Sequence, residues 1–173
     1  MPINTKPFIH ENVICANVFV RKGDKYLLIK RREDKKFAPG VIHPIGGKVD
    51  QNEDPFTAAK REVFEEAGIK IKNMRLEAVI LEINPPDDKA GDKNWLIFHF
   101  SADYASGKVK QNEEGELVLL SSKEIKSQKL FPSVKVVIDD ILNPGQGTVF
   151  MTTIYNEKGE VSTKQTLISK CLV

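Results

Sequence analysis

The chain has 173 residues and a net charge of +2, from 26 Lys and Arg against 24 Asp and Glu. This length predicts a single domain over residues 1–173, and 40% hydrophobic residues is typical of a folded protein. The near balance of charge gives no reason to expect a nucleic acid partner. Two cysteines, the lack of a long apolar run and a start unlike a signal peptide favour a cytoplasmic protein with no membrane partner.

The first part of the chain is predicted to form a β-hairpin and a loop. Alternating apolar and polar residues predict a strand over residues 13–21, and a second strand over 26–30 pairs back onto it. Residues 31–47 are rich in charge, proline and glycine, and we expect them to form a loop.

A helix is predicted over residues 55–67. Asp54 can cap its start, Pro55 suits its first turn and Gly68 can end it. These three residues define both ends of the helix from local signals alone.

The remainder of the chain is predicted to be rich in strands. The expected strands cover residues 75–84, 94–104, 115–120, 148–155 and 161–169. A short helix is expected after Ser121 or Ser122, and a longer one over residues 132–142. The histidines at 43 and 99 are more typical of packed or solvated side chains than of catalysts. These elements together predict a mixed α/β fold.

Three carboxylates of the helix at 55–67 fall within an arc of roughly 100°, because each helical residue advances about 100°. They are Glu62, Glu65 and Glu66. Like charges at these spacings repel, and a cation such as Mg²⁺ would turn that cost into attraction. Arg61 can pair with Glu65 four residues later or orient a neighbouring carboxylate. A Glu-rich stretch alone is more typical of a solvated helix face.

The segment around these carboxylates, residues 47–69, resembles the signature of the Nudix (MutT-like) hydrolases. That signature needs glycine, glutamate, arginine and aliphatic residues at fixed spacings. The matching residues are Gly47, Glu53, Arg61, Glu62, Val63, Glu65, Glu66, Gly68 and Ile69. The resemblance implies an α/β fold, an α/β/α sandwich built on a mixed sheet. It also implies a hydrolase that uses Mg²⁺ or Mn²⁺ to cleave a nucleoside diphosphate linked to another group.

The resemblance implies roles for residues within the segment and beside it. Glu62 and Glu66 are the expected metal ligands, with Glu65 as a third and the Gly46 carbonyl as a backbone ligand. Glu62 or a loop carboxylate is the expected general base. Arg61 is expected to orient Glu62 or Glu65.

Residues outside the segment are candidates for substrate and metal binding. Similar enzymes place an arginine against substrate phosphates where Arg31 and Arg32 end the second predicted strand, and Lys48 can also reach phosphate. Glu113 lies in a loop whose carboxylates bind a further metal in relatives. Solvation is the alternative interpretation of each of these charged residues.

The resemblance implies a small nucleotide substrate but leaves its identity open. Residues 46–49 and the C-terminal hairpin resemble enzymes of oxidised purine triphosphates such as 8-oxo-dGTP. We therefore expect a (d)NTP or oxidised (d)NTP that yields NMP and pyrophosphate, although residues 130–133 lack the acidic pair of some purine-selective relatives. The alternatives are ADP-ribose or a nucleotide sugar, which Pro85 weakly favours, and a nucleotide-binding domain without turnover. The oligomeric state is open, with a homodimer as one option.

Overall fold

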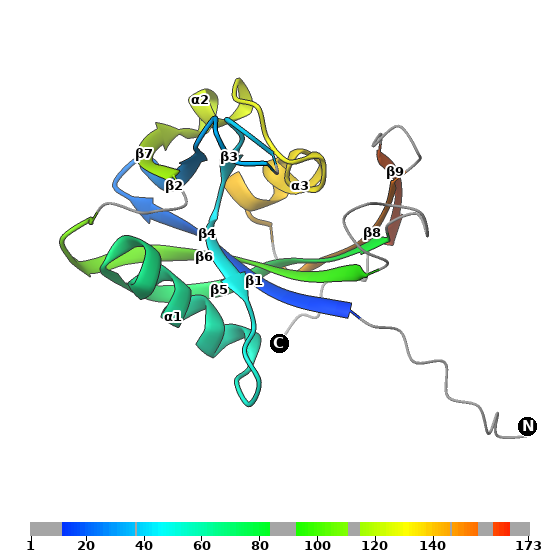
Figure 1. Cartoon of the computed structure of the whole chain (residues 1–173), viewed down its shortest axis with the longest axis horizontal. Helices are drawn as coiled ribbons and strands as arrows, with labels where there is room; N and C mark the ends of the chain where they lie inside the picture. Colours follow the sequence, from blue (N-terminus) through cyan, green and yellow to red (C-terminus); the bar gives the residue numbers. More distant parts are fainter. Residues whose placement is uncertain are drawn as a thin grey trace, which may run out of the picture.

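The computed structural model describes residues 12–36, 38–83, 93–110, 115–145 and 147–155, together with the backbone of residues 161–166. The chain folds into a mixed β-sheet with helices on both faces, so the expected α/β/α sandwich is confirmed (Figure 1). The strands are β1 (Asn12–Lys22), β2 (Lys25–Arg31), β3 (Ile42–His43), β4 (Ile45–Lys48), β5 (Ile69–Ile83), β6 (Asn94–Gly107), β7 (Gly115–Ser121), β8 (Val149–Tyr155) and β9 (Val161–Thr166). The helices are α1 (Pro55–Ala67), α2 (Ser122–Lys126) and α3 (Pro132–Leu142).

The sheet places β1 and β6 at its centre. The strand order is β3-β2-β1-β6-β5-β8-β9, with β4 paired to β1 and β7 paired to β2. The pairs β1–β6 and β5–β8 are parallel, and the remaining strand pairs are antiparallel. The sheet is therefore mixed, and its short strand β4 hydrogen-bonds to β1 beside the helix α1.

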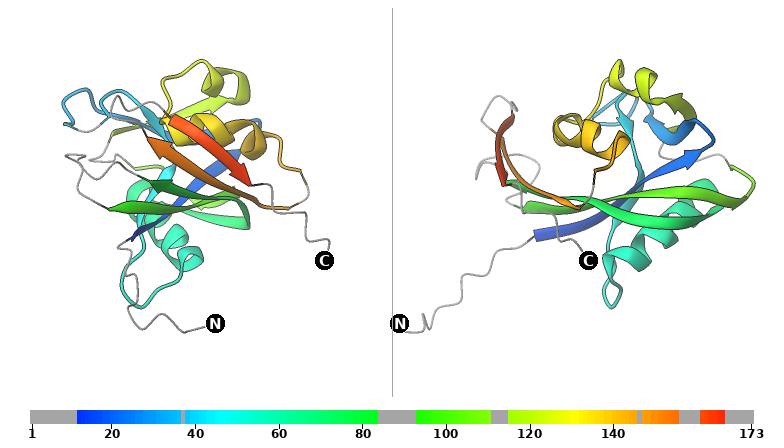
Figure 2. Two further views of the ribbon diagram at one scale, coloured as in Figure 1. Left: turned by 90° about the vertical axis from the view of Figure 1, so that its right-hand side faces the viewer. Right: turned by 180° about the vertical axis from the view of Figure 1, so that it is seen from behind.

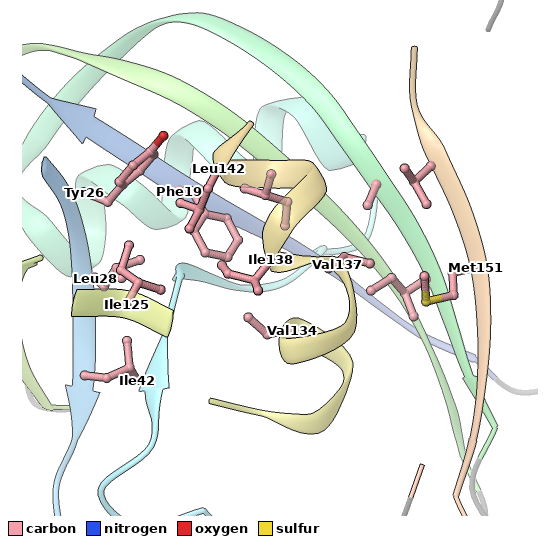
Figure 3. Close-up of a cluster of buried hydrophobic side chains, with 14 residues drawn as sticks. Phe19, Tyr26, Leu28, Ile42, Ile125, Val134, Val137, Ile138, Leu142 and Met151 are labelled. Carbon is pink, nitrogen blue, oxygen red and sulfur yellow. The ribbon is translucent and has the colours of Figure 1, made fainter. Parts of the chain in front are cut away.

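The two faces of the sheet carry separate hydrophobic cores. On one face, the small residues of α1 pack against alternate residues of β1 and β6. On the other face, α2 and α3 cover Phe19, Leu28 and Met151 with the apolar side chains that Figure 3 shows. Figure 2 shows α1 and α3 on opposite sides of the sheet in two further views. Period-two alternation along the central strands supplies both cores at once.

Most of the predicted elements are confirmed, and two boundaries are wrong. Residues 31–47 do not form only a loop, because β3 and most of β4 lie within them. The strand expected from residue 75 begins at Ile69 and contains several β-bulges. The connection between the two strands of the expected C-terminal hairpin, residues 156–160, lies outside the described residues. Within the described ranges, no helix combines the length and the apolar character needed to span a membrane.

Candidate active site

Helix α1 is fixed at both ends as the sequence predicts. The Asp54 side chain accepts hydrogen bonds from the backbone N–H groups of Phe56 and Thr57, at 2.8 and 3.1 Å. Pro55 occupies the first turn, and Gly68 ends the helix in the left-handed conformation with φ 69°. These caps and the buried alanines of α1 fix the helix against the sheet. The side of the helix from which its carboxylates project is therefore fixed as well.

Two carboxylates of α1 approach the backbone of β4. The Gly46 N–H donates to Glu66 Oε2 at 3.0 Å. A Cβ atom built at Gly47 would lie 2.5 Å from Glu62 Oε1, and one at Gly46 would lie 2.1 Å from the Ala16 carbonyl oxygen. A side chain at Gly46 would collide with the backbone of β1, and a side chain at Gly47 would displace the Glu62 carboxylate. The glycine pair therefore brings the backbone of β4 against Glu62 and Glu66.

The Arg61 guanidinium links three acidic side chains of the candidate site. Its guanidinium donates to Glu53 Oε1 at 2.5 Å, to Glu62 Oε1 at 2.9 Å and to Glu65 Oε2 at 3.0 Å. A further bond reaches the Lys48 carbonyl oxygen at 3.0 Å. The two alternatives that the sequence left open, pairing with Glu65 and orienting a neighbouring carboxylate, therefore both occur.

The three carboxylates bound by Arg61 differ in their exposure to water. The side chains of Glu53 and Glu62 are 12% and 14% exposed, whereas that of Glu65 is 56% exposed. Burial raises the pKa of Glu62, and its hydrogen bond from Arg61 opposes that shift. Glu62 is thus a sheltered carboxylate beside the glycine strand, and Glu65 is turned toward solvent.

A pocket of about 220 Å³ opens beside the glycine strand. Its lining residues are Ile29, Arg31, His43, Gly46, Gly47 and Glu66. The His43 ring packs edge-on against Phe131 with 5.5 Å between ring centroids. The pocket therefore combines a carboxylate from α1, the backbone of β4 and a cation from the end of β2.

The structure separates the other sequence-predicted residues. Arg31 lines the pocket, whereas Arg32 is exposed and pairs with Asp34 at 2.7 Å outside the pocket lining. The Lys48 ammonium lies 6.0 Å from the centre of the Trp95 ring. Glu113 lies outside the described residues.

Sequence reasoning missed Ile29 and His43 as pocket residues. Ile29 is one of several apolar residues of β2, and the sequence has no signal that separates it from core. His43 was expected to be only packed or solvated, although it stands three residues before Gly46. The closeness of His43 to Gly46 and Gly47 in the sequence was the signal that could have identified it as a pocket residue.

The residues present fit a hard divalent cation. Mg²⁺ binds oxygen atoms, keeps several waters and takes one or two protein carboxylates together with substrate phosphates. Glu62 and Glu66 offer two such carboxylates at the same two glycines. Within the described part of the chain, no group of three or more His, Cys, Asp or Glu side chains is arranged to hold a metal. A cation here would therefore depend on substrate and backbone oxygens as well.

The fold and this site define a hydrolase domain of the kind that the residues at 47–69 predict. A profile of the NUDIX domain matches residues 9–140. The chain belongs to the NUDIX family, and the expected class, a hydrolase acting on phosphoric anhydride bonds, is confirmed at the level of the family.

Relatives of known name match part of this chain. An NAD-capped RNA hydrolase NudC from Mannheimia succiniciproducens is 35% identical over 106 residues, which are 59% of this chain and 37% of that protein. A NudC from Pseudomonas aeruginosa is 29% identical over 102 residues, 56% of this chain and 31% of that protein. The chain thus spans about a third of the length of these relatives.

Solved structures match more of the chain and show the fold. A mutator MutT protein from Bacillus halodurans superposes with a TM-score of 0.77 at 24% identity, covering 91% of this chain and 99% of that one. A MutT NUDIX hydrolase from Burkholderia pseudomallei gives a TM-score of 0.64 at 24% identity, covering 76% and 99%. The fold is therefore shared over nearly the full length of both solved proteins and over 76–91% of this chain.

Proposed function

We propose that this chain hydrolyses the diphosphate linkage of a nucleoside diphosphate derivative with the help of Mg²⁺ or Mn²⁺. The observation that carries the proposal is the meeting of Glu62 and Glu66 at Gly46 and Gly47, beside a pocket lined by Arg31. Carboxylates suit a divalent cation, and an arginine suits the phosphates that such a cation neutralises.

The proposed roles follow from the positions of the side chains. Glu62 and Glu66, with the Gly46 carbonyl, would hold the cation, and Glu65, the more exposed carboxylate, stays a predicted third ligand. A divalent cation lowers the pKa of water and neutralises charge on the phosphates. Glu62 accepts a proton from the attacking water, which is worth typically 10²–10⁴-fold for a well-placed base.

Two arginines complete the proposed machinery. Arg61 fixes Glu62 in place through the 2.9 Å bond from its guanidinium. Arg31 donates to the substrate phosphates from the wall of the pocket, where a guanidinium can bind two phosphate oxygens at once. Arg32, Lys48 and Glu113 remain predictions for outer phosphate and metal contacts.

The first candidate substrate is a (d)NTP or oxidised (d)NTP, cleaved to NMP and pyrophosphate. The second candidate is a dinucleotide or nucleotide-sugar diphosphate such as NAD or ADP-ribose. The matched relatives favour the second candidate, because they are named for hydrolysis of NAD-capped RNA. Both candidates place a nucleoside diphosphate in the same pocket.

The experiment is a product analysis of dGTP, 8-oxo-dGTP, ADP-ribose and NAD with Mg²⁺, and with EDTA as the control. NMP with pyrophosphate identifies a triphosphate substrate, AMP with ribose phosphate identifies ADP-ribose, and AMP with nicotinamide mononucleotide identifies NAD. We expect at least one of these reactions, and EDTA should abolish it. Binding of all four without cleavage, in Mg²⁺ and in Mn²⁺, would show a nucleotide-binding domain without turnover.

A further inference from the structure

A carboxylate outside the proposed catalytic machinery, Glu82, lies near the C-terminal end of β5. The Tyr155 hydroxyl donates to Glu82 Oε1 at 3.3 Å, and the hydroxyl of Ser133 at the start of α3 also hydrogen-bonds to this carboxylate. Ser133 is only 3% exposed, whereas Glu82 is partly open to solvent. Three separate elements thus hold one acidic side chain in a fixed place.

Glu82 belongs to a row of side chains on the face of the sheet that carries α3. It stands opposite Trp95 on β6 and next to Thr153 on β8 in the strand register. Residues opposite each other on neighbouring strands point to the same face. The Thr153 hydroxyl is fully buried and has no hydrogen-bond partner among the described residues.

The row that contains Trp95 and Glu82 lies next to the proposed catalytic site. The Lys48 ammonium lies 6.0 Å from the centre of the Trp95 ring, and Lys48 follows Gly47 directly in β4. Strand β1 joins the two regions, because Asn17 pairs with Gly46 and Val13, four residues earlier, pairs with Trp95. A nucleotide with its phosphates at the glycines therefore has Trp95 and Glu82 within reach of its other end.

The hydrogen bonds of Glu82 leave room for a ligand. An ionised carboxylate has about four lone-pair sites, and Tyr155 and Ser133 occupy two of them. Two remain for donors as far as the described residues are concerned, and a carboxylate binds a pair of parallel N–H groups in bidentate fashion. Guanine presents such a pair at N1 and N2, whereas adenine offers one donor and one acceptor at the corresponding edge.

We propose that Glu82, held by Tyr155 and Ser133, reads the nucleobase of the substrate by accepting two N–H bonds from a guanine-type edge. Trp95 forms an aromatic wall beside that base. This proposal rests on the proposed function, since the phosphates at Gly46 and Gly47 set where the base lies. Within that function it takes the first candidate, a guanine (d)NTP, over the adenine-containing NAD and ADP-ribose.

The substitution Glu82→Gln tests the proposal, because an amide keeps the size of the side chain but presents one acceptor and one donor. We expect kcat/KM for dGTP to fall on the order of 10- to 100-fold, the size of one lost bidentate base contact. For dATP we expect less than a threefold change. Glu116→Gln, the same change at an exposed residue of β7, should leave both substrates unaffected. An equal fall for dGTP and dATP would overturn the proposal.

Tyr155→Phe provides a second variant that removes one donor to Glu82 and keeps the ring. It should lower kcat/KM for dGTP by a smaller factor than Glu82→Gln and spare dATP in the same way. Equal loss for both nucleotides in this variant would assign the cluster to folding alone.

A binding measurement separates this proposal from the proposed hydrolysis. Trp95 is the single tryptophan, so its fluorescence can report titration with GMP or AMP in the absence of metal. We expect GMP to bind more tightly than AMP, and Glu82→Gln to remove the difference. If no nucleotide is cleaved but this difference appears, hydrolysis fails and base reading stands. If nucleotides are cleaved but wild type and Glu82→Gln show the same base preference, base reading fails and hydrolysis stands.

Discussion

The two faces of the sheet treat buried charge in different ways. Beside α1, one guanidinium from Arg61 binds Glu53, Glu62 and Glu65 within 3.0 Å. Beneath α3, the fully buried His99 has no hydrogen-bond partner for either ring nitrogen among the described residues. Glu82 on the same face is held by neutral hydroxyls.

The two settings favour different protonation states. An opposite charge within hydrogen-bond distance favours the ionised form, so Arg61 holds the pKa of Glu53 below its usual range. Burial without a counter-charge favours the neutral form, and it lowers the pKa of His99 to about 3. The face of α1 therefore suits a cation and phosphates, whereas His99 on the face of α3 stays neutral.

The largest expected effect comes from neutralising one charge on the face of α1. Glu62→Gln should lower kcat by 10²-fold or more, because a proton acceptor and a metal ligand are lost together. The fold should persist, since repulsion among the carboxylates falls and the amide oxygen can still accept from Arg61. Steady-state kinetics at saturating Mg²⁺ and a thermal melt measure the two effects.

The matched variant Glu65→Gln sharpens this prediction. Glu65 is the exposed member of the set, at 56%, so its loss should cost less in kcat than the loss of Glu62. If both variants lost activity equally, the sheltered position of Glu62 would have no special role. Unchanged kcat in Glu62→Gln would falsify its assignment as base and ligand.

A smaller effect is expected on the face of α3, where His99 opposes folding in acid. Its folded pKa of about 3 lies below the ordinary value near 6.5, so the unfolded chain takes up a proton that the folded chain excludes. Its contribution to stability is therefore complete above about pH 6.5 and is lost as the pH falls toward 3. Between pH 7 and pH 5 this linkage costs about 2 kcal/mol.

His99→Leu tests that linkage. The variant should lose about 2 kcal/mol less than wild type in denaturant unfolding when the pH is lowered from 7 to 5. His43→Gln should change this pH dependence less than His99→Leu does, because burial is the larger cause of the lowered His99 pKa and His43 the smaller one. Identical pH dependence in wild type and His99→Leu would mean that His99 is protonated inside the fold.

The elements fixed by local signals could be predicted from the sequence. Asp54, Pro55 and Gly68 define α1 through interactions within a few residues, and the structure confirms all three. The grouping of Glu62, Glu65 and Glu66 on one arc follows from the helical period, whereas the exposure of Glu65 to solvent does not. The family fold was implied by the resemblance of residues 47–69 to the Nudix signature.

The remainder of the site depends on contacts between distant parts of the chain. The strands β3 and β4 were predicted as loop because residues 31–47 are rich in charge, proline and glycine. They form strands by pairing with β2 and β1. The setting of Glu82 requires α3 and β8 to meet at the end of β5, which local patterns do not encode. Such pairings are a property of the assembled sheet.

The sequence also left open whether Arg31 or Arg32 binds the substrate phosphates. Substitutions at these two residues have the smallest expected effect. β2 ends at Arg31, and neighbouring residues of a strand point to opposite faces. Arg31 lines the pocket, whereas Arg32 donates to both carboxylate oxygens of Asp34 in solvent. We therefore expect only Arg31 to bind the ground-state phosphates.

Arg31→Ala should raise KM roughly 10-fold, because a hydrogen bond to a charged group contributes about 1.5–3 kcal/mol. Arg32→Ala should change KM less than twofold, since an exposed ion pair contributes little. Steady-state kinetics with one substrate measure both. A fall in kcat with constant KM in Arg31→Ala would move this residue from ground-state binding to the transition state. A larger change in Arg32→Ala would require the loop after β2 to turn toward the pocket when substrate binds.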